Sequence, residues 1–132
     1  IKPGDIPPTG GLYLLDVVPD GEPRFGFPNI SDNAEIVEMI ACGAHLTLFT
    51  TGRGTPLGFP APTLKIASNS ALAEKKPHWI DFNAGPVVEG QSLDETADHL
   101  MDLILKVASG QPSCNEKNDE REIAIWKNGV TL

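Results

Sequence analysis

The residues best suited to chemistry form one short stretch, Phe49–Gly58, of sequence FTTGRGTPLG. Its single arginine, Arg53, supplies a planar fork of donors that matches a carboxylate or a phosphate. Flanking glycines allow backbone amides to approach an anion, and threonine hydroxyls both donate and accept hydrogen bonds. The residues that surround the arginine are Thr50, Thr51, Gly52, Gly54 and Thr55. The pattern predicts a site for a small, hydroxylated anion; an ordinary turn whose arginine pairs with a surface acid is the open alternative.

Known phosphate-binding motifs fit this stretch poorly. A Walker loop ends in Gly-Lys-Ser/Thr, which is absent. Gly52 and Gly54 begin like a dinucleotide fingerprint, but the third glycine is misplaced. Pro56 and the lack of a following helix pattern argue further against a nucleotide.

Metal binding is the second chemistry that the sequence offers. The side chains able to bind a metal are those of Asp16, Asp20, Cys42, His45, His78, Asp81 and His99, and none shows a spacing such as HExxH. His45 is expected to be structural, and His99 to lie on the exposed side of a helix. Asp16 and Asp81 lie inside apolar runs, where a charge needs a partner, so they are the metal candidates. No spacing indicates a Ser-His-Asp or Cys-His catalytic set.

The elements that must position these residues alternate between strand and helix patterns. Strands are predicted at Leu12–Val18, His45–Phe49, Thr63–Ala67, Trp79–Phe82 and within 122–132. Helices are predicted at about 32–41, 71–76 and from Ser92 to before Gly110, with residues 111–121 as a loop. The alternation favours a three-layer α/β fold with a mostly parallel sheet of four to five strands and flanking helices. The joint from Phe49 to Thr63 lacks a helix signal, so either this crossover is irregular or that pair is antiparallel.

In such sheets ligands bind beyond the carboxyl ends of the strands. The first predicted strand leads to Asp20, and the second leads into the Arg53 stretch. The third is followed by Ser68 and Asn69, and the fourth by Asn83, Ala84 and Gly85. Asn69 and Asn83 therefore join the predicted substrate-binding residues.

Composition excludes several classes of protein. The 132 residues carry a net charge of −8, and the longest basic cluster is Lys75-Lys76, so no nucleic-acid partner is expected. No apolar run reaches the about 18 residues that a membrane span needs. Two cysteines without a CxxC pair indicate reduced thiols in the cytoplasm. Residues 1–11, rich in proline and glycine and lacking an initial Met, are predicted to be a linker within a longer protein.

Several segments, in this order, resemble one family. They are GLYLLDV, LFTTGRGTPLG with PTLKIASN, IDFNAG, EGQSLDETADHLMDLILKVASG and EIAIWKNGVTL. They closely resemble the carboxy-terminal region of the altronate and galactarate dehydratases, a family of sugar-acid hydro-lyases that also includes a sulfolactate sulfo-lyase subunit. The resemblance implies that residues 12–132 are the C-terminal domain of such an enzyme, with a Rossmann-like sheet.

The resemblance also implies a reaction, the dehydration of a sugar acid to a 2-keto-3-deoxy acid with Fe2+ or Mn2+. Arg53 would hold the carboxylate, and Thr50, Thr51 and Thr55 would hold hydroxyls. The expected partners are the sugar acid, the rest of the longer chain and, because an isolated fragment would expose a sheet edge, a second copy in a homodimer. The alternatives are a non-catalytic domain for anion binding or subunit association, and a sulfo-lyase-like subunit.

Overall fold

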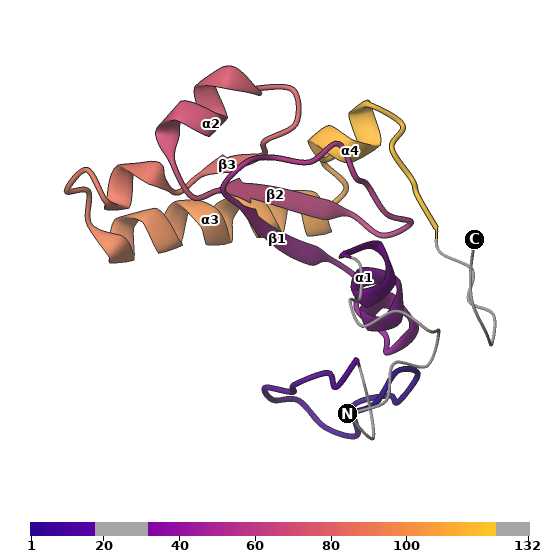
Figure 1. Ribbon diagram of the computed structural model, residues 1–132. Helices are drawn as coiled ribbons and strands as arrows, with labels where there is room; N and C mark the ends of the chain where they lie inside the picture. Colours follow the sequence, from indigo (N-terminus) through magenta and orange to yellow (C-terminus); the bar gives the residue numbers. More distant parts are fainter. Residues whose placement is uncertain (18–31, 124–132) are drawn as a thin grey trace. The chain divides into compact units, whose positions relative to one another are not determined.

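The computed structural model describes residues 1–17 and 32–123. The chain divides into two compact units, Ile1–His45 with Glu122–Leu132 in the first and Leu46–Arg121 in the second. The second is called the sheet unit here. It contains every strand of the described residues and the Arg53 stretch (Figure 1).

The sheet is parallel and has three strands. β1 (Thr47–Thr51), β2 (Thr63–Ala67) and β3 (Phe82–Asn83) lie in the order β1-β2-β3, with Thr47 opposite Thr63 and Ile66 opposite Phe82. The predicted irregular crossover is confirmed, because residues 52–62 join two parallel strands without a helix. Three prolines in this connection, at positions 56, 60 and 62, prevent a helix from forming there.

The prediction of four to five strands and a Rossmann-like sheet is not confirmed by the described residues. Leu12–Val17 forms no strand; Leu12 is 94% exposed, and this segment bonds the amino end instead. The Ile1 amino group donates to the Leu14 carbonyl (2.8 Å), and the Asp16 amide donates to the Ile1 carbonyl (2.8 Å). Within the described part of the chain this apolar run has no strand to pair with, which is why the strand prediction fails there. Val18 and residues 124–132, where the last strand was predicted, lie outside the described residues.

The fourth predicted strand, Trp79–Phe82, is displaced toward its carboxyl end. The amides of Trp79 and Ile80 both bond the Lys76 carbonyl (3.0 and 3.2 Å) in a turn after α2. Pairing with β2 therefore begins only at Phe82 and ends at Asn83.

The predicted helices are present. α1 spans Asp32–Ala41, α2 spans Ser70–Lys75 and α3 spans Leu93–Ala108. Asn69 caps α2 by accepting from the Leu72 amide (2.9 Å), and Ser92 caps α3 by accepting from the Glu95 amide (3.4 Å). None of the described helices is both long and apolar enough to cross a bilayer.

Two short elements were missed. A 3-10 turn, η2, spans Gly85–Val87, and a helix, α4, spans Cys114–Lys117 within the segment predicted as a loop. Ser113 and Glu116 form a capping box at α4: the Ser113 hydroxyl accepts from the Glu116 amide, and the Glu116 carboxylate accepts from the Ser113 amide (2.9 Å). The Ser-x-x-Glu spacing was therefore the signal for this helix.

β2 is the centre of the sheet unit, and all five of its residues are buried. Figure 1 shows α2 and α4 on one side of the strands and the long α3 on the other. Ala67 packs with Leu72 of α2 and with Ile80. Because β2 is covered on both faces, every side chain along it has to find a partner inside the protein.

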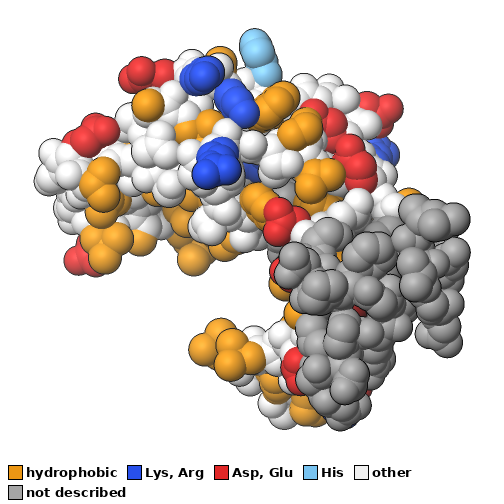
Figure 2. All heavy atoms as spheres, viewed as in Figure 1, with side chains coloured by type: hydrophobic (Ala, Val, Ile, Leu, Met, Phe, Trp, Pro, Cys, Tyr) orange, Lys and Arg blue, Asp and Glu red, His pale blue; other side chains and the backbone are white. Residues whose placement is uncertain are grey.

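The apolar side chains of α3 are only partly buried in the described structure. Val107 is buried, whereas Leu93, Met101 and Leu105 are exposed. Figure 2 shows hydrophobic side chains on the edge of the sheet unit where α3 lies in Figure 1. α3 thus presents an apolar surface as well as covering the sheet.

Gly58 gives a test of the packing between the crossover and α4. A methyl group at this position would overlap the backbone carbonyl of Glu120 and the Asn115 side chain. Gly58→Ala is therefore expected to lower the free energy of unfolding by about 1–3 kcal/mol, measured by urea denaturation. Gly10→Ala, where a methyl would meet no atom, is the matched control. Equal stability of the two variants would contradict this packing.

Candidate substrate-binding site

The predicted edge of the sheet is built by side chains that follow all three strands. The Asn69 amide, after β2, donates through Nδ2 to the Gly52 carbonyl after β1 (3.2 Å). Asn83, at the end of β3, donates through Nδ2 to the Ser70 hydroxyl (3.2 Å). The carboxyl ends of the strands therefore meet, as expected for a parallel sheet.

Asn69 and Asn83 shape this edge through both ends of their amides. The Oδ1 atom of Asn69 caps α2, and that of Asn83 accepts from the Gly85 amide (2.9 Å). Gly85 is required here, because a methyl group at this position would overlap the backbone of Ser70. The structure thus gives these two asparagines positioning contacts; their predicted contact with a ligand stays a prediction.

The segment Gly52–Gly58 is called the arginine loop here. Residues 52–57 make no backbone–backbone hydrogen bond within the described part of the chain. Side chains from outside the loop hold four of its carbonyls instead. These carbonyls and their donors are Gly52 with Asn69 (3.2 Å), Arg53 with Lys76 (2.9 Å), Thr55 with Lys65, and Leu57 with Asn115 (2.8 Å).

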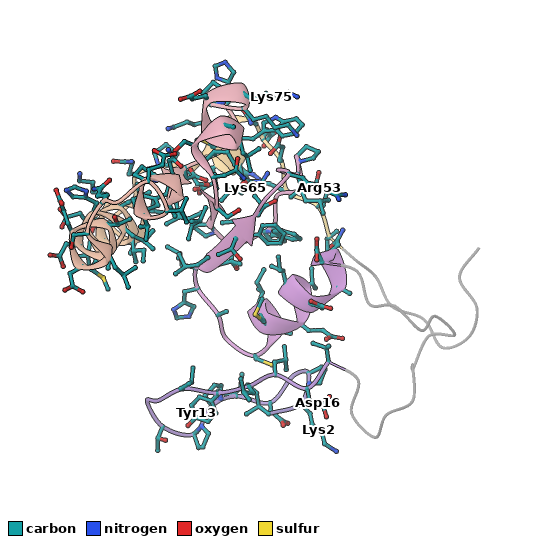
Figure 3. The ribbon with its side chains drawn as sticks, turned by 60° about the vertical axis from the view of Figure 1, so that its left-hand side comes forward. Lys2, Tyr13, Asp16, Arg53, Lys65 and Lys75 are labelled. Carbon is teal, nitrogen blue, oxygen red and sulfur yellow. The ribbon has the colours of Figure 1, made fainter. Side chains whose placement is uncertain are left out.

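This arrangement determines which groups of the loop remain available. In a trans peptide the C=O and the following N–H point in opposite directions, and the described chain has no cis peptide. The Gly52 carbonyl faces Asn69, so the Arg53 amide points away from it. The Arg53 guanidinium is exposed and makes no hydrogen bond or ion pair with any described residue (Figure 3). Arg53 can therefore offer a side-chain fork, and its own amide, to an anion.

The threonines of the stretch divide into two kinds. The Thr51 hydroxyl accepts from the Gly54 amide (2.9 Å), and the Thr55 hydroxyl accepts from the Leu57 amide (3.3 Å). These contacts shape the loop, and each hydroxyl keeps its hydrogen for donation. Thr50 is exposed and its hydroxyl bonds no described residue. Gly54 has φ +77°, a left-handed conformation that favours glycine.

Lys65 is the residue that the sequence reasoning missed. It lies in the middle of β2 with its side chain 1% exposed, and its ammonium lies 3.6 Å from the Glu120 carboxylate. Figure 3 shows it inside the sheet unit, in contrast to Arg53. Alternation placed Leu64 and Ile66 on one face and Lys65 on the other; the signal overlooked was that a central strand buries both faces.

Asp81 has a structural partner on each carboxylate oxygen. One oxygen accepts from the backbone amide of Lys65 (2.8 Å) and the other from that of Cys114 (2.7 Å). Burial, with the Asp81 charge and hydrogen bond adding to it, raises the pKa of the Cys114 thiol from 9.0 to about 11, despite the opposing charges of Lys117 and Lys65. The thiol is therefore neutral at pH 7 and unsuited to nucleophilic attack.

The metal candidates are not brought together. No group of three His, Cys, Asp or Glu side chains forms a metal site within residues 1–17 and 32–123. Asp16 belongs to the amino-terminal unit, Asp81 is held by two amides, and Asp20 lies outside the described residues. The described side chains therefore do not fit a divalent ion.

Comparison with known proteins decides the family. Residues 1–131 match the family model described as D-galactarate/altronate dehydratase, C-terminal. The chain belongs to this family. It is 43% identical to the altronate dehydratase of Escherichia coli K12 over 131 residues and 44% identical to that of Bacillus subtilis 168 over 133 residues.

A third relative acts on a different sugar acid. The chain is 40% identical over 116 residues to the E. coli galactarate dehydratase (L-threo-forming). The matches cover 94%, 100% and 82% of this chain but only 26%, 24% and 22% of the three relatives. The chain thus spans about a quarter of the length of the curated relatives it matches.

The raised pKa of Cys114 predicts slow alkylation. In a Cys42→Ser background, iodoacetamide should modify Cys114 about a hundredfold more slowly at pH 8 than a thiol of pKa 9.0, because only the thiolate reacts. The rate should rise with pH toward 11. Asp81→Asn removes the second cause of the shift, so it should accelerate the reaction. Rates measured by mass spectrometry that level off above pH 9 would contradict this assignment.

Proposed function

We propose that the full-length protein containing this chain is a hydro-lyase that dehydrates a sugar acid of the altronate or galactarate type to a 2-keto-3-deoxy acid. The observation that carries the proposal is the exposed guanidinium of Arg53, which pairs with no described residue, on a loop whose sequence belongs to this family. The acid would come from sugar catabolism in the cytoplasm. A homodimer, in which a second copy covers exposed surface, is part of the same proposal.

The proposed role of the arginine loop is to hold the carboxylate of the acid. A guanidinium matches a carboxylate with two parallel charge-assisted hydrogen bonds, and the Arg53 amide supplies a further donor. Thr50, Thr51 and Thr55 can donate to the neighbouring sugar hydroxyls. Dehydration requires loss of the proton beside the carboxylate, which leaves negative charge on the carboxylate oxygens. A cation fixed there favours that charge and so lowers the barrier.

The proton-transfer groups and the metal belong to other parts of the proposed site. Glu120 and Asp81 are committed to structural contacts, so neither serves as the base in this proposal. Dependence on Fe2+ or Mn2+ remains part of the proposal, but the described residues do not form the metal site. Removal of water from the acid therefore needs more of the longer protein than the arginine loop.

Arg53→Ala tests the role of the loop in the full-length protein. Loss of two charge-assisted hydrogen bonds should raise KM for altronate or galactarate by about ten- to a hundredfold. Formation of the 2-keto-3-deoxy acid gives kcat and KM. Arg121→Ala is the matched control, because Arg121 is exposed and its only partner among the described residues is the neighbouring Asp119 (3.3 Å).

The outcomes separate the enzyme from the alternatives. A wild-type protein that dehydrates neither acid nor any related sugar acid would overturn the hydro-lyase proposal. Binding of the acids without turnover would favour an anion-binding domain, and sulfite release from sulfolactate would favour a sulfo-lyase. Unchanged KM in Arg53→Ala would remove Arg53 from the site.

The proposed metal dependence has its own test. Treatment of the full-length protein with a chelator under anaerobic, reducing conditions should abolish dehydration, and added Fe2+ or Mn2+ should restore it. Mg2+ serves as the comparison ion, because it gives up its water ligands reluctantly and is rarely held by protein side chains alone. Full activity in the metal-free protein, verified by elemental analysis, would exclude the metal.

A further inference from the structure

We propose that Lys65 is a positioning residue whose buried ammonium fixes the arginine loop in the conformation that presents Arg53. The inference rests on the proposed function, in which the arginine loop binds the carboxylate of the sugar acid. Lys65 itself touches no ligand; it acts through the Thr55 carbonyl, two residues beyond Arg53.

The conformation of the arginine loop depends on hydrogen-bond donors from other segments, because its own backbone supplies few hydrogen bonds. Residues 52–57 make no backbone–backbone hydrogen bond within the described chain. Pro56 has no N–H to offer, and the amides of Gly54 and Leu57 bond threonine hydroxyls of the same stretch. Lys65 and Asn115 reach the central part of the loop from beneath, at Thr55 and Leu57. Without them these carbonyls would lose the only donors that the described structure gives them.

Lys65 and Asn115 are themselves tied together by Glu120. The Glu120 carboxylate lies 3.6 Å from the Lys65 ammonium and accepts from the Asn115 amide (3.1 Å). The three polar side chains form one cluster under the loop, in which Lys65 and Asn115 are buried and Glu120 is 18% exposed. A buried ammonium is tolerated only where it is paired and hydrogen-bonded, so the Lys65 side chain depends on the Thr55 carbonyl and the Glu120 carboxylate. These contacts fix the position and the orientation of the arginine loop relative to β2.

Apolar residues in place of both Lys65 and Glu120 could fill the same space without an ion pair, so the charged pair invites a functional explanation. Apolar replacement of a buried ion pair is often neutral or stabilising in other proteins. A leucine or methionine at position 65 could complete the core, but it could not bond the Thr55 carbonyl. The geometry therefore gives the lysine a role in the placement of the loop.

A double-mutant cycle in the full-length protein tests this inference. Lys65→Met should raise KM for the sugar acid about tenfold, and Lys65→Met with Arg53→Ala should be no worse than Arg53→Ala alone, within about twofold, because both changes remove the same contact. Lys75→Met is the matched control: Lys75 carries the same side chain, exposed at the end of α2 (Figure 3), and its replacement should leave KM unchanged.

A purely structural role for Lys65 gives a different pattern. Ile66→Val, a conservative change at the next buried position of β2, should reduce stability without raising KM. Additive effects of Lys65→Met and Arg53→Ala on KM, or an unchanged KM in Lys65→Met, would overturn the positioning role and leave the proposed function intact. The proposed function fails separately, if Arg53→Ala has no effect or the wild type has no activity.

A second variant keeps the test decisive if Lys65→Met does not fold. Glu120→Gln retains the size and an acceptor oxygen of the side chain but removes the charge that faces Lys65. It should raise KM about threefold and again show no additional effect in the Arg53→Ala background. Faster hydrogen exchange at the amides of Gly54 and Leu57, with unchanged exchange in α3, should accompany it. Wild-type KM in a folded Glu120→Gln protein would overturn the inference.

Discussion

The sheet unit is organised around one constraint, a positive charge in the middle of its central strand. Lys65 lies where a strand covered on both faces would ordinarily carry an apolar side chain. Its ammonium can be accommodated only if oxygen atoms reach it inside the protein. The Thr55 carbonyl and the Glu120 carboxylate do so, and they come from segments on opposite sides of β2 in the sequence. The irregular crossover and the carboxyl-terminal end of the sheet unit thus both contact the Lys65 ammonium.

The position of α4 follows from the same constraint. This helix is only four residues long, so it gains little from its own hydrogen bonds. The Asp81 carboxylate accepts a hydrogen bond from the amide of Cys114, the first residue of α4. The Asn115 side chain, also in α4, donates to the Leu57 carbonyl of the arginine loop. Asp81 also accepts from the Lys65 amide, so one carboxylate connects the backbone of β2 to α4. The raised pKa of Cys114 is a consequence of this arrangement.

The sequence predicted the features that depend on local chemistry. The predicted ranges of α2 and α3 agree with the structure, and the lack of a helix signal between Phe49 and Thr63 had left an irregular crossover as one of two expected forms. Features that depend on distant contacts were not predictable in this way. Leu12–Val17 has the composition of a buried strand, yet a strand also needs a neighbour. Lys65 reads as a solvent-facing residue in an alternating strand until α2 and α4 are known to cover that face.

The same distinction applies to the site. The Arg53 stretch was singled out from residue types alone, and its contact with a ligand stays a prediction. The side chains that bond the loop were not recognisable from the sequence, since Lys76, Lys65 and Asn115 come from separate parts of the chain. Together with Asn69, these side chains engage four carbonyls of the loop, while the Arg53 guanidinium, the Arg53 amide and the Thr50 hydroxyl bond no described residue. A loop that keeps donors available while several of its acceptors are engaged favours an anion over a cation, and this preference arises from the buried lysine as well as from the exposed arginine.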